Sequence, residues 1–506
     1  MNKKSALLYF ILTLILFLGL WFRLKGISTN HSFWSDEAFV SSFSQDIITG
    51  KTSWIKGASM VGYQPLQIVV TAFSFMIFGI SEFSARLPTV LFGVIGIFFA
   101  FLVAKKLSNW SGGLLAAFLM AFSQLNLSHA TQAKPYVVLQ TLFLVQIYLL
   151  IKLIDKKKLS ALVMLFITTC IVYFFHSLAV LFWISFGITL IVTYFLNLKK
   201  LIQKPLIVLG ILLSIVLVMY FFGIFKELII LFKPLNGRFL FAYSNTVFLK
   251  NIFLRQYGIF LIPAILSFLM IDKKYRGLIA GIICYIFVLL FMWNFRSYSH
   301  NMRYLMTFFG FIFVFFGVFL GKITDLLYLK FQSASWRTNL KLIPILVLIT
   351  IYISSYKIVC TPQNYYSPNL DLYGDVQNAD YKTMFAWIEK KYGNDINKIA
   401  IFDDLIDSER FYLNRSSNAY FMKGAIKPYP HPINKIMILC SLDDFLKQKA
   451  RYQSGILIIE DWESFLPEDI KQYAKKNLRL EYRVEKMTVG GERDIWPLEV
   501  RSWGMN

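Results

Sequence analysis

The chain has 506 residues, of which 57% are hydrophobic and 16% are charged, whereas soluble proteins carry roughly 25% charged residues. This composition excludes an ordinary soluble protein, and the 50 Phe and 27 Tyr residues are typical of the spans and interfaces of a polytopic membrane protein. The formal net charge of +23 does not indicate nucleic-acid binding, because Lys and Arg stand in short clusters between apolar runs, where anionic membrane lipids are the expected partners.

The first apolar run covers residues 6–22 and follows the basic start Met1-Asn2-Lys3-Lys4. No small-residue cleavage site follows it, and comparable runs recur along the chain, so we expect an uncleaved first span with a cytoplasmic N-terminus. A span requires about 20 apolar residues, with about 17 workable. By this measure the further candidate spans are 65–79, 88–104, 111–127, 137–152, 159–175, 178–196, 206–225, 257–271, 277–294, 304–320 and 342–357.

Two adjacent carboxylates, Asp36 and Glu37, follow the first span within an aromatic-flanked stretch, Phe33 to Phe39. Charges beside a bilayer are costly and need a reason. One interpretation is a helix start, with Ser35 as the N-cap and the two acids in the first turn. The other is a general base, or a ligand of a divalent metal cation, at the mouth of a membrane cavity. The two interpretations are compatible, because a capped helix fixes the direction of a carboxylate.

The basic clusters predict the topology, because such clusters stay in the cytoplasm. They place the end of run 137–152 inside, and an odd number of crossings is then required between residues 65 and 152, where the sequence shows four apolar runs. One run therefore does not cross fully. We favour run 65–79, which starts at a proline and ends at a glycine; the alternative is run 111–127. Either choice predicts about eleven spans in a polytopic α-helical domain.

This topology gathers polar groups on the outer face of the membrane. Lys134 and Arg303 lie there, and Arg86 does too if run 65–79 is the one that does not cross; if run 111–127 does not cross, Arg86 is cytoplasmic. Each has an ordinary interpretation as an interfacial residue that reaches lipid headgroups. Each is equally suited to hold a phosphate. His176 interrupts an apolar stretch between two spans, a place more typical of a turn residue than of a ligand.

The C-terminal region, residues 361–506, is polar and follows the membrane domain of residues 1–360. We predict that it is an extracytoplasmic α/β domain, with a helix from Asp380 to Tyr392 that ends before Gly393. Three short apolar runs of buried-strand type, each followed by acidic residues, argue for a parallel sheet: 398–402, 436–440 and 456–459. No glycine-rich phosphate loop follows them, so a nucleotide site is not expected.

The four cysteines do not form a zinc-ligand pattern. Cys170 and Cys284 lie in apolar runs and are expected to behave as small hydrophobic residues. Cys360 and Cys440 lie in the polar region, where an oxidising compartment permits pairing, but their spacing does not decide it.

Five motifs in a fixed order resemble bacterial relatives of the dolichyl-phosphate-mannose protein mannosyltransferases. These are membrane glycosyltransferases of the C-type fold, a group that includes the aminoarabinose transferases of lipid A. The resemblance covers roughly residues 5–310. The motifs are Trp34-Ser35-Asp36-Glu37, Gln64-Pro65-Leu66, Gly79 with Glu82 and Arg86-Leu87-Pro88, Lys134-Pro135-Tyr136, and Arg303-Tyr304.

The sequence departs from these relatives at three positions. Gln132 stands where many carry an acid, which argues against a metal site that would use this position. Lys134 stands where many carry Arg, which keeps the charge but loses the planar fork. Gln64 stands where others have a second proline.

The resemblance implies an enzyme of the cell envelope, multi-pass in the inner (plasma) membrane. It would transfer a hexose or pentose, with inversion, from a polyprenyl-phosphate donor to a lipid, glycan or protein on the extracytoplasmic face. Asp36 is the expected base or metal ligand, with Glu37 as a second catalytic residue. Arg86, Lys134 and Arg303 are expected to bind the donor phosphate. Further substrate contacts are expected from Tyr63, Gln64, Tyr136, His176 and Tyr304.

A transporter and a receptor are the alternative functions. A transporter or flippase of lipid-linked sugars should show inverted repeats and broken helices, and no repeat is visible in the sequence. A receptor led by the C-terminal domain would not need so many spans. We therefore favour the glycosyltransferase.

Overall fold

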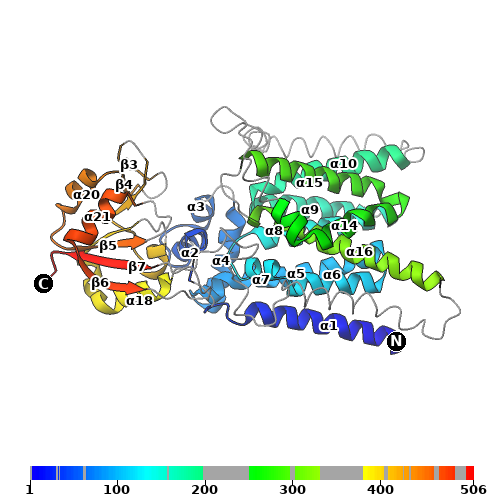
Figure 1. The fold of residues 1–506 in the computed structure, drawn as a ribbon, viewed down its shortest axis with the longest axis horizontal. Coiled ribbons are helices and arrows are strands. Elements are labelled where there is room, and N and C mark those ends of the chain that lie inside the picture. Colours follow the sequence, from blue (N-terminus) through cyan, green and yellow to red (C-terminus); the bar gives the residue numbers. More distant parts are fainter. Residues whose placement is uncertain are drawn as a thin grey trace.

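An α-helical bundle is joined to a C-terminal α/β domain (Figure 1). The computed structural model describes residues 3–29, 32–33, 35–60, 64–156, 159–197, 250–296, 302–330, 380–403, 408–424, 427–431, 435–460, 466–484 and 497–505. The predicted boundary near residue 360, the apolar runs 206–225 and 342–357, and Cys360 with its predicted pairing lie outside these residues.

Among the described residues, five helices are long and apolar enough to cross a membrane. They correspond to α1 (Lys3–Leu24), α5 (Glu82–Leu107), α8 (Tyr136–Lys156), α15 (Arg276–Arg296) and α16 (Met306–Lys330). Shorter apolar helices pack beside them: α6 (Trp110–Phe122), α9 (Leu159–Phe175), α10 (Val180–Asn197) and α14 (Gly258–Met270). The prediction of a polytopic α-helical membrane protein with a C-terminal α/β domain is confirmed, while the number of spans stays a prediction.

Helix α4 (Pro65–Phe78) has 14 residues, which is about 21 Å of helix and less than the hydrocarbon core of about 30 Å. It packs against α2 (Ser35–Ile48) and α3 (Trp54–Ser59), at the end of the bundle that faces the C-terminal domain (Figure 1). Helix α6 (Trp110–Phe122), in the alternative run 111–127, has only 13 residues, so length does not decide between the two runs, and the choice of run 65–79 stays a prediction.

The predicted run 111–127 is interrupted at Ser123. Helix α6 ends at Phe122, Ser123 is extended, and α7 (Gln124–Ala130) follows. The last carbonyl groups of a helix have no partner within it. Here the buried side chain of Arg23, from α1, donates to the carbonyls of Met120 and Ala121 at 2.9 Å each. This contact holds the broken helix that leads into the segment carrying Lys134.

The C-terminal domain contains a seven-stranded sheet among its described residues, in the order β3-β4-β2-β1-β5-β7-β6. Its centre is parallel: β1 (Ala400–Phe402), β2 (Ala419–Phe421), β4 (Met437–Leu439) and β5 (Gly455–Glu460). Three strands pair antiparallel with their neighbours: β3 (Tyr429–Pro430) at one edge, β6 (Arg479–Val484) at the other, and β7 (Leu498–Trp503) between β5 and β6. The three predicted strands are present, but the sheet is mixed, so the expectation of a parallel sheet holds only for its centre.

The predicted helix of this domain is α18 (Tyr381–Tyr392). Asp380 caps it by accepting from the backbone N–H of Thr383 at 3.1 Å, and Gly393 ends it with a φ of +45°. Helix α18 covers one face of the sheet. Helices α20 (Leu442–Lys449) and α21 (Glu468–Asn477) cover the other. The short helix α19 (Ser408–Tyr412) packs against α2 of the bundle.

Candidate active site

Helix α2 begins at Ser35 and carries Asp36 and Glu37 in its first turn, so the expected helix start is present, while the N-cap role of Ser35 stays a prediction. Successive residues of a helix point in different directions, and the two carboxylates accordingly meet different partners. Glu37 is completely buried, whereas the side chain of Asp36 is 41% exposed. The two acids therefore cannot share one role.

Glu37 forms a buried ion pair with Arg86 of α5. Arg86 Nε donates to Glu37 Oε1 at 2.9 Å and Nη2 donates to Oε2 at 3.4 Å. Glu37 Oε1 also accepts from the backbone N–H of Ala133 at 2.8 Å, and Arg86 Nη1 donates to the carbonyl of Ile27 at 2.6 Å. Both side chains are at most 1% exposed, and the guanidinium lies 4.9 Å from the ring centre of Phe33. The pair thereby joins α2, α5 and the segment that precedes Lys134.

Asp36 faces two cations. Its Oδ2 forms an ion pair with Arg303 Nη1 and lies 3.7 Å from Lys134 Nζ. Lys134 follows Ala133, which Glu37 holds, and Arg303 belongs to the turn η5 (Met302–Leu305) at the start of α16. Lys134 is 3% exposed and Arg303 13% exposed. Among these three groups one positive charge is in excess, a balance that favours an anionic ligand.

The charges set the ionisation of the neighbouring groups. Burial raises the pKa of Asp36, but the charges of Arg303 and Lys134 outweigh it and hold that pKa below its ordinary value. Burial, together with the same cations, lowers the pKa of the buried His129 to about 3. Burial and Arg303 lower the pKa of His176 to about 3, with Asp36 acting in the opposite direction. At neutral pH Asp36 is ionised and both imidazoles are neutral.

His176 acts as a turn residue. Its Nδ1 accepts from the backbone N–H of Leu178 at 3.0 Å and caps the short helix η1 (Ser177–Ala179). Its ring centre also lies 5.6 Å from that of Tyr136. The turn interpretation and the proximity to the predicted site therefore both hold.

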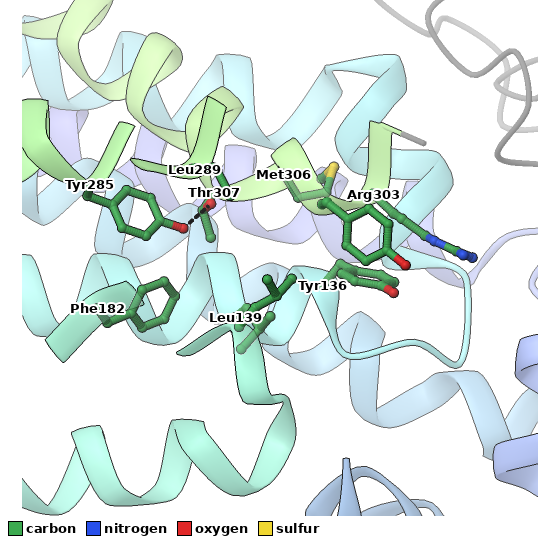
Figure 2. Close-up of a pocket in the computed structure, with 10 residues that line it drawn as sticks. Tyr136, Leu139, Phe182, Tyr285, Leu289, Arg303, Met306 and Thr307 are labelled. Carbon is green, nitrogen blue, oxygen red and sulfur yellow. Dashed lines mark hydrogen bonds between the residues drawn. The ribbon is translucent and has the colours of Figure 1, made fainter. Parts of the chain in front are cut away.

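A small pocket, with a cavity volume of about 10 Å³, opens beside this cluster (Figure 2). Tyr136, Arg303 and Tyr304 form one end: the two tyrosine rings meet edge to face at 5.4 Å, and the guanidinium lies within 5.8 Å of both ring centres. Leu139, Leu178, Phe182, Leu289 and Met306 make the remaining wall apolar, and Tyr285 and Thr307, whose hydroxyl oxygens are 2.6 Å apart, complete it. The pocket thus has one charged, aromatic end and one apolar end.

The structure brings together six of the predicted residues: Asp36, Lys134, Arg303, Tyr136, Tyr304 and His176. Glu37 and Arg86 lie nearby as a buried pair whose hydrogen-bond partners are protein groups. Gln64 is buried at the N-terminus of α4 and does not line this pocket. Tyr63 lies outside the described residues.

Sequence reasoning missed His129, Phe182, Tyr285 and Thr307. His129 had a signal, because it belongs to a polar interruption after run 111–127. Tyr285 and Thr307 had a weaker one, as polar groups inside apolar runs. Phe182 had none, because the sequence does not distinguish an apolar residue that lines a pocket from one in the core.

The described residues do not fit the expected metal site. Among them, no group of three or more His, Cys, Asp or Glu side chains is placed to hold a metal ion. The proposed ligand Asp36 already faces two cations, and Gln132 provides no carboxylate.

Known proteins share this architecture. The family model described as dolichyl-phosphate-mannose-protein mannosyltransferase matches residues 64–222. No curated protein sequence matches the chain. Among solved structures, ArnT from Cupriavidus metallidurans, both apo and bound to undecaprenyl phosphate, is 12% identical with a TM-score of 0.59, over 99% of this chain and 98% of that chain.

A second similar structure is the archaeal oligosaccharyltransferase AglB from Archaeoglobus fulgidus, in complex with an inhibitory peptide and a dolichol-phosphate. It is 11% identical with a TM-score of 0.54, over 90% of this chain and 70% of that chain. At these identities the likeness establishes the fold. The predicted resemblance to the mannosyltransferase family and to the aminoarabinose transferases is confirmed, and so is the C-type fold.

Proposed function

We propose that this protein transfers a sugar from a polyprenyl-phosphate donor to an acceptor on the outer face of the membrane. The observation that carries the proposal is the cluster of Asp36, Lys134 and Arg303 beside a pocket with an apolar wall. The charged end and the apolar wall match in chemical character the anionic head and the isoprenoid tail of such a donor. The solved structures of similar fold that hold undecaprenyl phosphate or dolichol-phosphate support the same ligand class.

Lys134 and Arg303 are the proposed donor-phosphate ligands. The phosphate gains negative charge as the glycosidic bond breaks, and cations already in place stabilise that charge. Arg303 provides a planar fork for two phosphate oxygens, and Lys134 provides a point charge. In this proposal the two side chains supply the positive charge for which the sequence had suggested a metal ion.

Asp36 is the proposed base. It is the partly exposed carboxylate of the pair, so an acceptor hydroxyl can reach it. The neighbouring cations keep it ionised but also make it a weak base. A donor phosphate bound to Lys134 and Arg303 offsets these charges, so we expect the basicity of Asp36 to rise when the donor is present. Attack by the acceptor oxygen on the sugar carbon then proceeds with inversion.

We assign Glu37 and Arg86 a positioning role instead of the catalytic and phosphate-binding roles suggested by the motifs. Their hydrogen bonds to each other, to the carbonyl of Ile27 and to the N–H of Ala133 support this assignment. A buried ion pair whose remaining groups are satisfied holds its neighbours in place.

The test is the affinity of the purified protein, in lipid nanodiscs, for undecaprenyl phosphate. We expect Lys134→Ala and Arg303→Ala each to weaken binding by about 10- to 100-fold, because a hydrogen bond to a charged group contributes about 1.5–3 kcal/mol. Lys56→Ala, which removes an exposed lysine of α3, is the matched control and should bind normally. Normal binding by both site variants would overturn the proposal.

The reaction itself is tested in cells, by mass spectrometry of surface glycolipids and glycoproteins with and without this protein. A sugar modification that disappears with the protein, and with the Lys134→Ala variant, supports the proposal. Identical spectra in all strains would contradict it.

A further inference from the structure

Tyr412, on α19 of the C-terminal domain, contacts the chain just before the N-terminus of α2. We call α2, which carries Asp36, the active-site helix. The backbone N–H of Phe33 donates to the Tyr412 hydroxyl oxygen at 2.8 Å. The Tyr412 hydroxyl donates in turn to Glu82 Oε1, on α5. Phe33 precedes Asp36 by three residues, so this contact fixes the chain immediately before the first turn of α2.

A second route leads from Tyr412 to the phosphate-binding segment. Glu82 Oε2 lies 4.0 Å from Arg86 Nη1, and Arg86 is paired with Glu37. Glu37 accepts from the N–H of Ala133, the residue before Lys134. The hydroxyl of one C-terminal-domain residue is therefore connected, through side-chain contacts, to both sides of the candidate site.

The same domain holds this region at further points. Lys382, in the first turn of α18, contacts Glu82 Oε2 at 3.0 Å, and its backbone N–H donates to Ser32 Oγ at 3.0 Å. The ring of Tyr412 stacks on Phe385 at 5.4 Å with an interplanar angle of 17°. Burial and the charge of Glu82 raise the pKa of Tyr412, so its hydroxyl stays protonated and keeps donating to Glu82.

We propose that Tyr412 is a positioning residue, through which the C-terminal domain sets the direction of Asp36. The proposal rests on the proposed glycosyl transfer, because it assigns Tyr412 a part in that reaction. The hydroxyl acts by holding Phe33 and Glu82 in place. Without it we expect the carboxylate of Asp36 to shift, and a displacement of about 1 Å is expected to slow transfer strongly. In this proposal the C-terminal domain contributes to catalysis by positioning Asp36.

The decisive variant is Tyr412→Phe, which removes the hydroxyl and keeps the ring. We expect the amount of transferred sugar per protein, measured by mass spectrometry, to fall about tenfold. The affinity for undecaprenyl phosphate should stay within about twofold, because Lys134 lies at the end of the longer route, and the melting temperature should change little. Tyr392→Phe, a second hydroxyl of the same domain, is the control and should transfer normally.

Amide hydrogen exchange gives a readout that does not depend on activity. We expect the peptide that contains Phe33 to exchange faster in Tyr412→Phe, while peptides of β1 and β5 exchange as in the wild type. Normal transfer or unchanged exchange at Phe33 overturns the proposal, and so does a transfer loss that only follows a lower melting temperature. Failure of the glycosyltransferase proposal is seen separately, as normal undecaprenyl phosphate binding by Lys134→Ala and Arg303→Ala.

Discussion

At the scale of single residues, the charge of Asp36 both opposes donor binding and makes the reaction possible. Asp36 is paired with Lys134 and Arg303, the two cations that the donor phosphate is proposed to bind. A bound phosphate must compete for them, and by doing so it releases the carboxylate to act as a base. Binding and chemistry are therefore expected to respond in opposite directions when this one side chain is neutralised.

We expect Asp36→Asn to lower sugar transfer by at least about 100-fold, the usual contribution of a positioned base. The same change should leave the affinity for undecaprenyl phosphate unchanged or higher, because the competing negative charge is gone. Asp443→Asn, at an exposed acid of α20 far from the docking contacts, is the control and should retain most of its transfer. Near-normal transfer by Asp36→Asn would remove this residue from the mechanism.

The two buried histidines predict how stability depends on pH. Their pKa of about 3 in the folded protein lies below the ordinary value of 6.5, so the unfolded chain takes up protons that the folded protein does not. Stability is complete above pH 6.5 and falls as the pH drops from 6.5 towards 3, by up to about 1.4 kcal/mol per pH unit for each histidine.

The measurement is the melting temperature of the protein in nanodiscs between pH 7.5 and about pH 4.5. We expect His129→Gln to show a smaller decrease over this range than the wild type. Equal decreases in the two proteins would show that His129 does not titrate in this way.

At the scale of elements, the sequence predicts helices and strands that depend on local residues, but it does not predict pairs between residues far apart in the chain. Helix α18 follows from its cap, Asp380, and from Gly393, and the central strands follow from their short apolar runs. Strand β7 escaped prediction because it buries Glu499 and Arg501, which pair at 2.7 Å and look exposed in the sequence. The sequence likewise predicts separate roles for Glu37 and Arg86, because their contact spans 49 residues and depends on tertiary packing.

The break between α6 and α7 depends on Arg23. Replacing it by Leu leaves the carbonyls of Met120 and Ala121 without these donors inside the bundle. We expect Arg23→Leu to destabilise the protein by about 3 kcal/mol or more, whereas Arg23→Lys, which keeps the charge, should cost less. Thermal unfolding in nanodiscs measures both, and equal stability of wild type and Arg23→Leu would refute a structural role for this side chain.

At the scale of the whole molecule, the N-terminus lies at the end of the bundle opposite the C-terminal domain, and the candidate site lies where the domain docks (Figure 1). The resemblance in the sequence ends near residue 310, so it gave no indication that residues beyond 400 reach the base of α2. The docking is made by aromatic packing of Phe411 on Phe33 at 4.6 Å and by the ion pair between Arg410 and Asp46. An aromatic residue in a helix of only five residues carries no sequence signal of such a contact.

The docking can be weakened without unfolding either part, because Phe411 packs in a cluster with Phe33 and Phe75 that is separate from the two cores of the sheet. We expect Phe411→Ala to increase hydrogen exchange in the peptide containing Phe33 and in the first turn of α2, and to leave exchange in β1 and β5 unchanged. Transfer should fall at least as far as in Tyr412→Phe, since both the ring contact and the position of the hydroxyl are lost. Faster exchange across the sheet would instead mean that the domain has unfolded, and unchanged exchange at Phe33 would mean that α19 does not hold the active-site helix.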